Sequence, residues 1–116
     1  MCPTDRKEIG SDGEQKASDY LQDKGYEIVS TNYRYKRGEV DLIAKKGSLL
    51  VFVEVKTRNN LQYGNPESFV SARQQELILE AANAYMIDTD WQGLVRYDII
   101  AVVPGKEIEH FEDAFY

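Results

Sequence analysis

Apolar residues recur along this chain with two different periods, which predict helices in some segments and strands in others. Spacings of three and four residues predict a helix over residues 10–25, closed by Gly25, and a longer helix over about 67–87. Alternating or continuous apolar runs predict strands at residues 26–35, 39–45, 49–57 and 94–103, and a short edge strand at 108–111.

The connections between these segments predict how the strands pair. Short turns around 36–38 and 46–48 join the first three strands, so neighbouring strands there run antiparallel. The strand after the long helix can pair in parallel through a crossover. The expected fold class is α/β, ordered helix–three strands–helix–strand, with helices packed on a mixed central sheet. A length of 116 residues suits a single domain spanning 1–116, with residues 1–9 as a flexible N-terminal segment.

The third predicted strand breaks the pattern of a buried strand. Its apolar run, LLVFV, continues into Glu54 and Lys56, and strand alternation puts both on the face that carries Leu50 and Phe52. Burying a carboxylate and an ammonium group is costly unless both have partners. Two interpretations stay open, because the two side chains either form a structural ion pair or serve a functional site.

The second predicted strand repeats this anomaly. Alternation puts Asp41 on one face and Val40 and Leu42 on the other. The hairpin turn that follows brings Asp41 opposite roughly position 53, with Glu54 close by, so the two carboxylates can converge. Two carboxylates brought together repel each other unless a cation lies between them, and Mg²⁺ prefers such oxygen ligands.

These residues suggest a division of labour at a metal site. Asp41 and Glu54 would hold Mg²⁺, or Mn²⁺ in its place, together with the carbonyl oxygen of Val55. Such an ion lowers the pKa of a bound water and neutralises charge on a scissile phosphate. Lys56 would position that water or stabilise the transition state. Glu14, in the first turn of the predicted first helix, would add a ligand or orient a bound water.

Composition and charge limit the location, the metal sites and the partners that the protein can have. No apolar run approaches the roughly 20 residues of a membrane helix, and the N-terminus has no signal-peptide pattern, so we expect a cytoplasmic protein with no membrane partner. One cysteine and one histidine exclude a Cys/His zinc site by count. The net charge of −6 argues against simple nucleic-acid binding. Residues 34–58 nevertheless hold seven basic and three acidic residues, whereas 107–116 hold four acids and no Lys or Arg.

Residues 10–58 resemble the signature half of a known family. The matching pieces are Gly13-Glu14, Asn32-Tyr33-Arg34, the run GEVDLI at 38–43 and the run FVEVKTR at 52–58. This segment is similar to the YraN-like family of small bacterial proteins, which is usually described as uncharacterised. That family is assigned to the restriction-endonuclease-like, or PD-(D/E)xK, superfamily and is similar in plan to archaeal Holliday-junction resolvases. The resemblance therefore implies a restriction-endonuclease-like core.

The resemblance also implies roles for the residues singled out above. It implies that Asp41 and Glu54 are the metal-binding carboxylates, that Lys56 is the catalytic lysine, and that Glu14 is the helix glutamate of the resolvase branch. This chain departs from the family in its acidity and at Ser71-Ala72-Arg73-Gln74-Gln75, where relatives commonly have Lys. Both departures concern DNA binding rather than the metal site.

We therefore expect a metal-dependent endonuclease that hydrolyses phosphodiester bonds in DNA, either duplex or branched. The expected phosphate contacts are Arg34, Arg37, Arg58 and Arg73. A homodimer is also expected, because a two-fold enzyme can address both strands of a duplex. One alternative is a nucleic-acid-binding accessory protein with an inactive or partner-activated site, and another is a protein-interaction domain. Asp98, in the apolar fourth strand, either helps the site or pairs with a basic residue.

Overall fold

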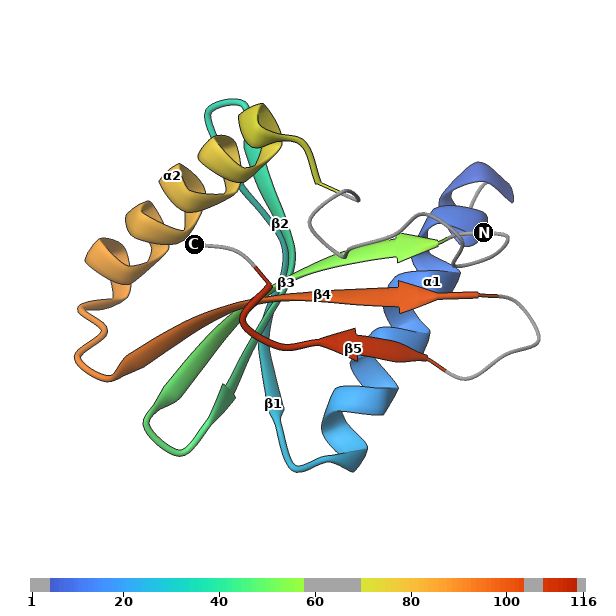
Figure 1. Cartoon of the computed structure of the whole chain (residues 1–116), viewed down its shortest axis with the longest axis horizontal. Helices are drawn as coiled ribbons and strands as arrows, with labels where there is room; N and C mark the ends of the chain where they lie inside the picture. Colours follow the sequence, from blue (N-terminus) through green and yellow to red (C-terminus); the bar gives the residue numbers. More distant parts are fainter. Residues whose placement is uncertain (1–4, 58–69, 104–107, 115–116) are drawn as a thin grey trace.

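The computed structural model describes residues 5–57, 70–103 and 108–114, with the backbone alone for residues 5–12. The described strands form one sheet in the order β1-β2-β3-β4-β5, with α1 on one face and α2 on the other (Figure 1). The elements in chain order are α1 (Asp5–Asp23), β1 (Glu27–Tyr35), β2 (Gly38–Lys46), β3 (Leu49–Thr57), α2 (Ala72–Thr89), β4 (Leu94–Val102) and β5 (Glu109–Phe111).

Strand pairing follows the predicted plan. The β1–β2 and β2–β3 pairs are antiparallel hairpins, β3 and β4 are parallel, and β4 and β5 are antiparallel. The chain crosses from β3 to β4 through α2, as a parallel pair requires. The mixed sheet is confirmed, and β3 is its central strand.

The predicted start of the first helix was wrong. The helix α1 begins at Asp5, so residues 5–9 belong to it and Glu14 lies in its middle rather than in its first turn. The sequence favours a start near residue 10, because Ser11 and Asp12 are typical helix caps. Inside the helix, Gly13 lies against β3, because a Cβ atom built there would lie 2.5 Å from the Thr57 Oγ1 atom. Glycine therefore lets the helix approach the end of the central strand.

The helix α2 also differs from its predicted bounds. Its cap is Ser71, whose side chain accepts a hydrogen bond of 3.1 Å from the backbone N–H of Gln74. The expected start at 67 lies outside the described residues, and Val70 and Ser71 precede the helix. The helix ends at Thr89, two residues later than predicted, where Asp90 adopts a left-handed backbone with a φ of 54°.

Two apolar layers hold the helices to the sheet. The layer under α2 includes Phe52, Ile78 and Ile99, and the layer under α1 includes Leu21 and Val53. Full burial of one such side chain contributes roughly 1.5–3 kcal/mol. Along β3 the side chains alternate between the layers as predicted. Among the described residues, no helix combines the length and apolar character needed to span a membrane.

The strand β2 does not alternate as predicted. Val40 packs in the layer under α2, whereas Leu42 packs in the layer under α1, so the two side chains lie on opposite faces. The pairs Tyr33–Val40 and Thr31–Leu42 place Asn32 beside Asp41 on the neighbouring strand. Asn32 has a φ of 50°, a left-handed conformation that interrupts the pleat. The change of face therefore occurs at Asp41, the predicted metal ligand.

Asp98 pairs with basic residues, which decides between the two interpretations of this residue. It is fully buried and accepts hydrogen bonds from Arg96 Nε (2.9 Å), His110 Nε2 (2.7 Å) and the backbone N–H of Asp113 (3.0 Å). Because a carboxylate only accepts, Nε2 of His110 carries the hydrogen of this bond, and Nδ1 on the other side of the ring lies 3.3 Å from the Tyr20 hydroxyl. This network joins β4 to β5 and α1, on the face of the sheet opposite Glu54.

Breaking the Asp98 network should destabilise the fold without removing the site. Burial alone would raise the pKa of Asp98, but hydrogen bonds from His110, Arg96 and Asp113 lower it. The stabilisation is therefore present above about pH 4, the ordinary pKa of an unfolded Asp, and is lost as the pH falls through the lowered value. We expect Asp98→Ala to lower the free energy of unfolding by roughly 3–5 kcal/mol at pH 7, because it removes the buried carboxylate that Arg96 and His110 contact.

Urea unfolding at pH 7 measures this change, and Asp98→Asn, which keeps the shape, should lose less. Glu112→Gln is the matched control, because Glu112 contacts Arg96 only at 3.7 Å from an exposed position. A loss for Asp98→Ala no larger than that of Glu112→Gln would contradict the proposed role of the network.

Candidate active site

Asp41 is anchored to the end of the central strand. The β2–β3 register pairs Leu42 with Val53, and its continuation brings Asp41 opposite Glu54, one residue further than predicted. The Oδ2 atom of Asp41 accepts a hydrogen bond of 2.8 Å from the backbone N–H of Val55. This bond fixes the Asp41 carboxylate beside the peptide that joins Glu54 to Val55, so the two predicted metal ligands converge.

Glu54 has two donors on one oxygen. Its Oε2 atom accepts a hydrogen bond of 2.9 Å from Gln74 Nε2 on α2, and Lys56 Nζ lies 3.3 Å from the same atom. The side chains of Glu54 and Lys56 are 8 % and 18 % exposed, so this ion pair is largely shielded from water. The prediction that both point from β3 toward the layer with Phe52 is confirmed for Glu54 by its contact with α2.

The two carboxylates resist being ionised together. Burial and the charge of Glu54 raise the pKa of Asp41 to about 7, against the opposing hydrogen bond from Val55. Burial also raises the pKa of Glu54, although the Lys56 ammonium and a hydrogen bond from the Asp41 carboxyl oppose this. A carboxyl pair of this kind retains a proton near neutral pH, and a cation bound between the two groups would replace that proton.

Glu14 lies beside this pair but is held by other partners. The amide of Asn32 donates to Glu14 Oε1 at 3.2 Å and to Glu39 Oε2 at 3.2 Å, so it joins α1 to β2. The charges of Glu14 and Glu39 both raise the pKa of Asp41, which places them within electrostatic reach of it. Across the described residues, no three Asp, Glu, His or Cys side chains are grouped closely enough to hold an ion. A third ligand role for Glu14 stays a prediction.

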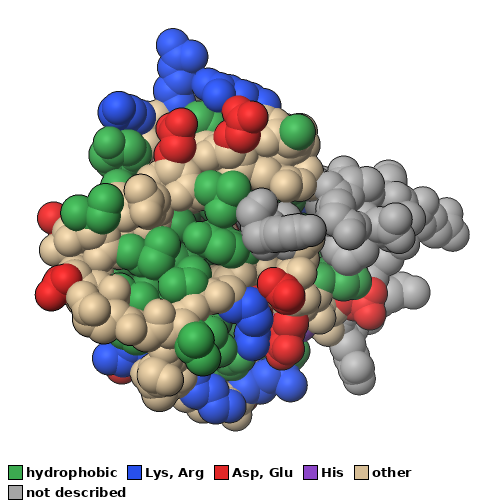
Figure 2. All heavy atoms as spheres, turned by 60° about the vertical axis from the view of Figure 1, so that its left-hand side comes forward, with side chains coloured by type: hydrophobic (Ala, Val, Ile, Leu, Met, Phe, Trp, Pro, Cys, Tyr) green, Lys and Arg blue, Asp and Glu red, His purple; other side chains and the backbone are tan. Residues whose placement is uncertain are grey.

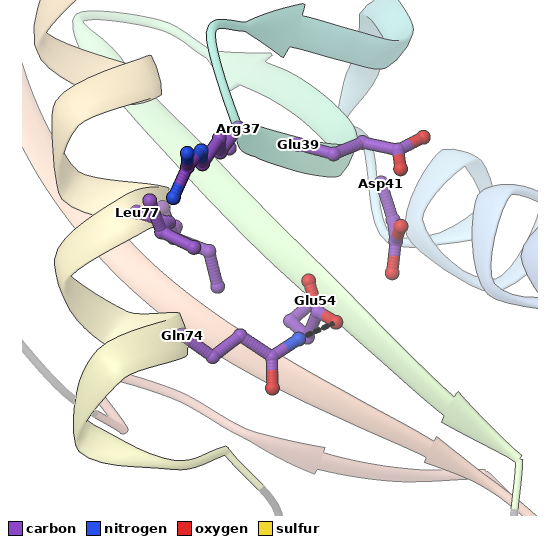
Figure 3. A pocket seen from close by; sticks show the side chains of 8 residues that line it. Arg37, Glu39, Asp41, Glu54, Gln74 and Leu77 are labelled. Carbon is purple, nitrogen blue, oxygen red and sulfur yellow. Dashed lines mark hydrogen bonds between the residues drawn. The ribbon is translucent and has the colours of Figure 1, made fainter.

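A pocket of about 280 Å³ opens over the carboxylate pair. Figure 3 shows Glu39 and Asp41 on the β2 side of the pocket, and Gln74 reaching from α2 to Glu54. The wall between the β1–β2 turn and α2 depends on Gly38, because a Cβ atom there would collide with the backbone oxygen of Leu77. The pocket is lined by Arg37, Gly38, Glu39, Asp41, Glu54, Gln74, Leu77 and Ile78.

The arginines that were predicted to contact phosphates lie in different surroundings. Arg37 lines the pocket and, with Arg73 and Lys36, also lines a shallower hollow beside it. Arg34 is 77 % exposed and lies 3.8 Å from Glu39, and Arg73 pairs with Glu76 at 3.1 Å. Arg58 lies outside the described residues. The structure therefore brings Arg37 closest to the candidate site, with Arg73 next to it.

Two residues of the site were missed from the sequence. Gln74 is a polar residue one turn before Ile78 on the buried face of α2. This interruption of the apolar stripe could have indicated that Gln74 contacts the site. Asn32 lies in one of the pieces that match the family, but its contacts could not be predicted, because they depend on a left-handed backbone and on the approach of α1 to β2. Both contact carboxylates that the sequence had already picked out.

The fold is shared with a solved nuclease structure. The structure of *Archaeoglobus fulgidus* Hjc, a Holliday junction resolvase, superposes with a TM-score of 0.53 over 84 % of this chain and 74 % of that chain, at 17 % identity. The fold is therefore restriction-endonuclease-like, as the resemblance implied. At this identity the likeness concerns the fold alone.

The chain belongs to the uncharacterised protein family UPF0102, whose profile matches residues 13–102. This is the YraN family that the sequence resembles. A UPF0102 protein of *Christiangramia forsetii* is 44 % identical over 115 residues, covering 97 % of both chains. A UPF0102 protein of *Flavobacterium psychrophilum* is 43 % identical over the same length and coverage. That of *Thermodesulfovibrio yellowstonii* is 41 % identical over 111 residues, covering 96 % of this chain and 98 % of its own.

The repulsion between Asp41 and Glu54 should appear as a cost in stability. Because the folded protein raises the pKa of Asp41 from 3.8 to about 7, it binds this proton more tightly than the unfolded chain does. Stability should therefore fall as the pH rises from 4 to 8. We expect Asp41→Asn, which keeps an acceptor for Val55, to be more stable than the original chain by about 1–3 kcal/mol at pH 8, with a smaller gap at pH 5.

Thermal unfolding at several pH values, without added metal, measures this gap. Asp88→Asn removes one carboxylate from an exposed position near the end of α2, and so reports the effect of net charge alone. A gap for Asp41→Asn that is absent, or that shrinks as the pH rises, would contradict the assigned repulsion.

Proposed function

We propose that this protein is a divalent-metal-dependent nuclease that hydrolyses phosphodiester bonds in DNA. The observation that carries the proposal is the convergence of the half-buried carboxylate of Asp41 on β2 with the buried Glu54 and the shielded Lys56 at the end of the central strand β3. Such a pair of carboxylates with no functional partner would be a costly way to hold two strands together. The restriction-endonuclease-like fold, shared with a resolvase, supports this proposal.

The donor set fits Mg²⁺ or Mn²⁺. Asp41, Glu54 and the carbonyl of Val55 offer oxygen ligands, and these ions complete their coordination with water. Burial raises the pKa of both carboxyls, and the charge of Glu54 adds to the shift of Asp41, so a bound cation would be favoured at this point. A bound ion would supply an activated water and neutralise charge on the phosphate under attack.

Lys56 is the residue that would contact the reacting phosphate. Its ammonium has three donors, and the pair with Glu54 Oε2 uses one of them at 3.3 Å. It would donate to a phosphate oxygen and so stabilise the charge that develops there. The side chain is 18 % exposed, so part of it is open to an incoming phosphate.

Basic residues on one side of the pocket would guide the nucleic acid. Figure 2 shows Lys and Arg side chains gathered at the top of the face that carries α2, near the β1–β2 turn of Figure 1. Arg37 lines the pocket there, with Lys36 and Arg73 next to it. Contacts of these residues with phosphates would position the strand without reading its sequence. Duplex and branched DNA are therefore the substrates to test first.

Cleavage of a panel of duplex and branched DNAs should depend on Mg²⁺ or Mn²⁺ and stop when EDTA removes the metal. We expect Asp41→Ala and Glu54→Ala to lower the cleavage rate by at least about 100-fold, because each removes a metal ligand. Lys56→Ala should cause a loss of similar size by removing a donor to the transition state.

The exposed residue Asp88, near the end of α2 and outside the residues that line the pocket and the hollow, supplies a control, and Asp88→Ala should cleave at nearly the original rate. Cleavage at full rate in both carboxylate variants would contradict the proposal and indicate another nuclease in the sample. Salt-dependent DNA binding without any metal-dependent cleavage would instead favour the accessory protein with an inactive or partner-activated site. The expected homodimer stays a prediction, which sedimentation at several concentrations would test.

A further inference from the structure

Gln74 is the uncharged polar residue that reaches the carboxylate pair from α2. It lies in the first turn of the helix, where Ser71 Oγ accepts from its backbone N–H at 3.1 Å. Its side-chain amide donates to Glu54 Oε2 at 2.9 Å (Figure 3). The amide therefore crosses the space between the helix and the sheet and joins the start of α2 to the candidate metal ligand.

The oxygen that Gln74 contacts is also the oxygen next to Lys56. The amide bond to Oε2 is the shorter contact, at 2.9 Å against 3.3 Å for the ammonium. When Lys56 turns to a substrate, Oε2 would otherwise lose its partner while remaining buried, which is unfavourable for a charged group. With Gln74 in place, the carboxylate keeps one donor and its orientation.

The start of α2 does not need the Gln74 side chain for its own stability. The backbone N–H of Gln75 donates to Ser71 O at 2.9 Å, and the Gln75 side chain donates to Val70 O at 3.1 Å. These bonds and the Ser71 cap close the helix start. The Gln74 amide is directed instead into the pocket, where a hydrophobic residue would continue the stripe formed by Ile78 and Ala82.

We propose that Gln74 is a positioning residue. It holds the Glu54 carboxylate in the orientation of a metal ligand, so that Lys56 can move from Glu54 to the substrate. This inference rests on the proposed function, because it assigns a role within the same metal site. Gln74 touches neither the ion nor the phosphate and acts through Glu54 alone. A neutral donor suits this role, since a cation at the same place would compete with the metal for the charge of Glu54.

The test compares two glutamines in the same turn of α2. Gln74→Met keeps the length of the side chain and removes the donor to Glu54, whereas Gln75→Met removes the bond to the Val70 carbonyl. We expect Mn²⁺ affinity, measured by titration calorimetry on the protein without DNA, to fall about tenfold for Gln74→Met and less than twofold for Gln75→Met. With DNA as substrate, kcat should fall for Gln74→Met while KM stays within twofold.

Thermal unfolding of each variant confirms that it is folded, and Gln74→Asn, whose amide is one methylene too short, replaces Gln74→Met if the latter fails to fold. Equal loss of Mn²⁺ affinity in the Gln74 and Gln75 variants would overturn the inference, because it would mean general loosening of α2. Unchanged affinity in Gln74→Met, with normal binding and cleavage by the original chain, would overturn this inference alone. Failure of the original chain to bind Mn²⁺ would overturn the proposed function as well.

Discussion

The repulsion between Asp41 and Glu54 is the constraint on which the rest of the site depends. The hydrogen bond from Val55 fixes one carboxylate, and Gln74 and Lys56 hold the other, so neither can rotate away from its neighbour. Burial then raises the pKa of both groups. The carboxylate pair therefore provides a position where a bound proton or a bound cation stabilises the fold. Only the bound cation would support the proposed hydrolysis.

The two faces of the sheet have different roles, because one carries a stabilising hydrogen-bond network and the other carries the candidate site. Asp98 and its partners lie on the α1 face, where they join β4 to β5 and the helix with every polar group satisfied. Glu54 lies on the α2 face of the neighbouring strand, within reach of the helix start. On the other side of β3 from β4 lies β2, whose side chains change face at Asp41. That change lets Asp41 face the pocket while the strand on either side of it remains buried.

Much of this arrangement could be predicted from the sequence, because alternation and turn residues are local properties. The bounds of β3, the mixed sheet and the convergence of Asp41 with Glu54 followed from apolar spacing and a short hairpin. The rest depended on contacts between distant segments. The start of α1 was misplaced because Ser11 and Asp12 are typical helix caps, and the packing of Gly13 against Thr57 is not visible in sequence. The change of face in β2 occurs at Asp41, beside the left-handed backbone of Asn32 on β1, which alternation does not predict. Gln74 was missed because a single polar residue in a predicted helix does not indicate which residue its side chain contacts.

The proposed function requires that Asp41 and Glu54 share one divalent ion. A crystal structure of the protein soaked with Mn²⁺, with data collected at the manganese absorption edge, would locate that ion. We expect an anomalous peak between the two carboxylates, at roughly 2.0–2.3 Å from an oxygen of each and with the Val55 carbonyl beside it. A peak elsewhere, or no peak while the two carboxyls remain hydrogen-bonded to each other, would contradict it.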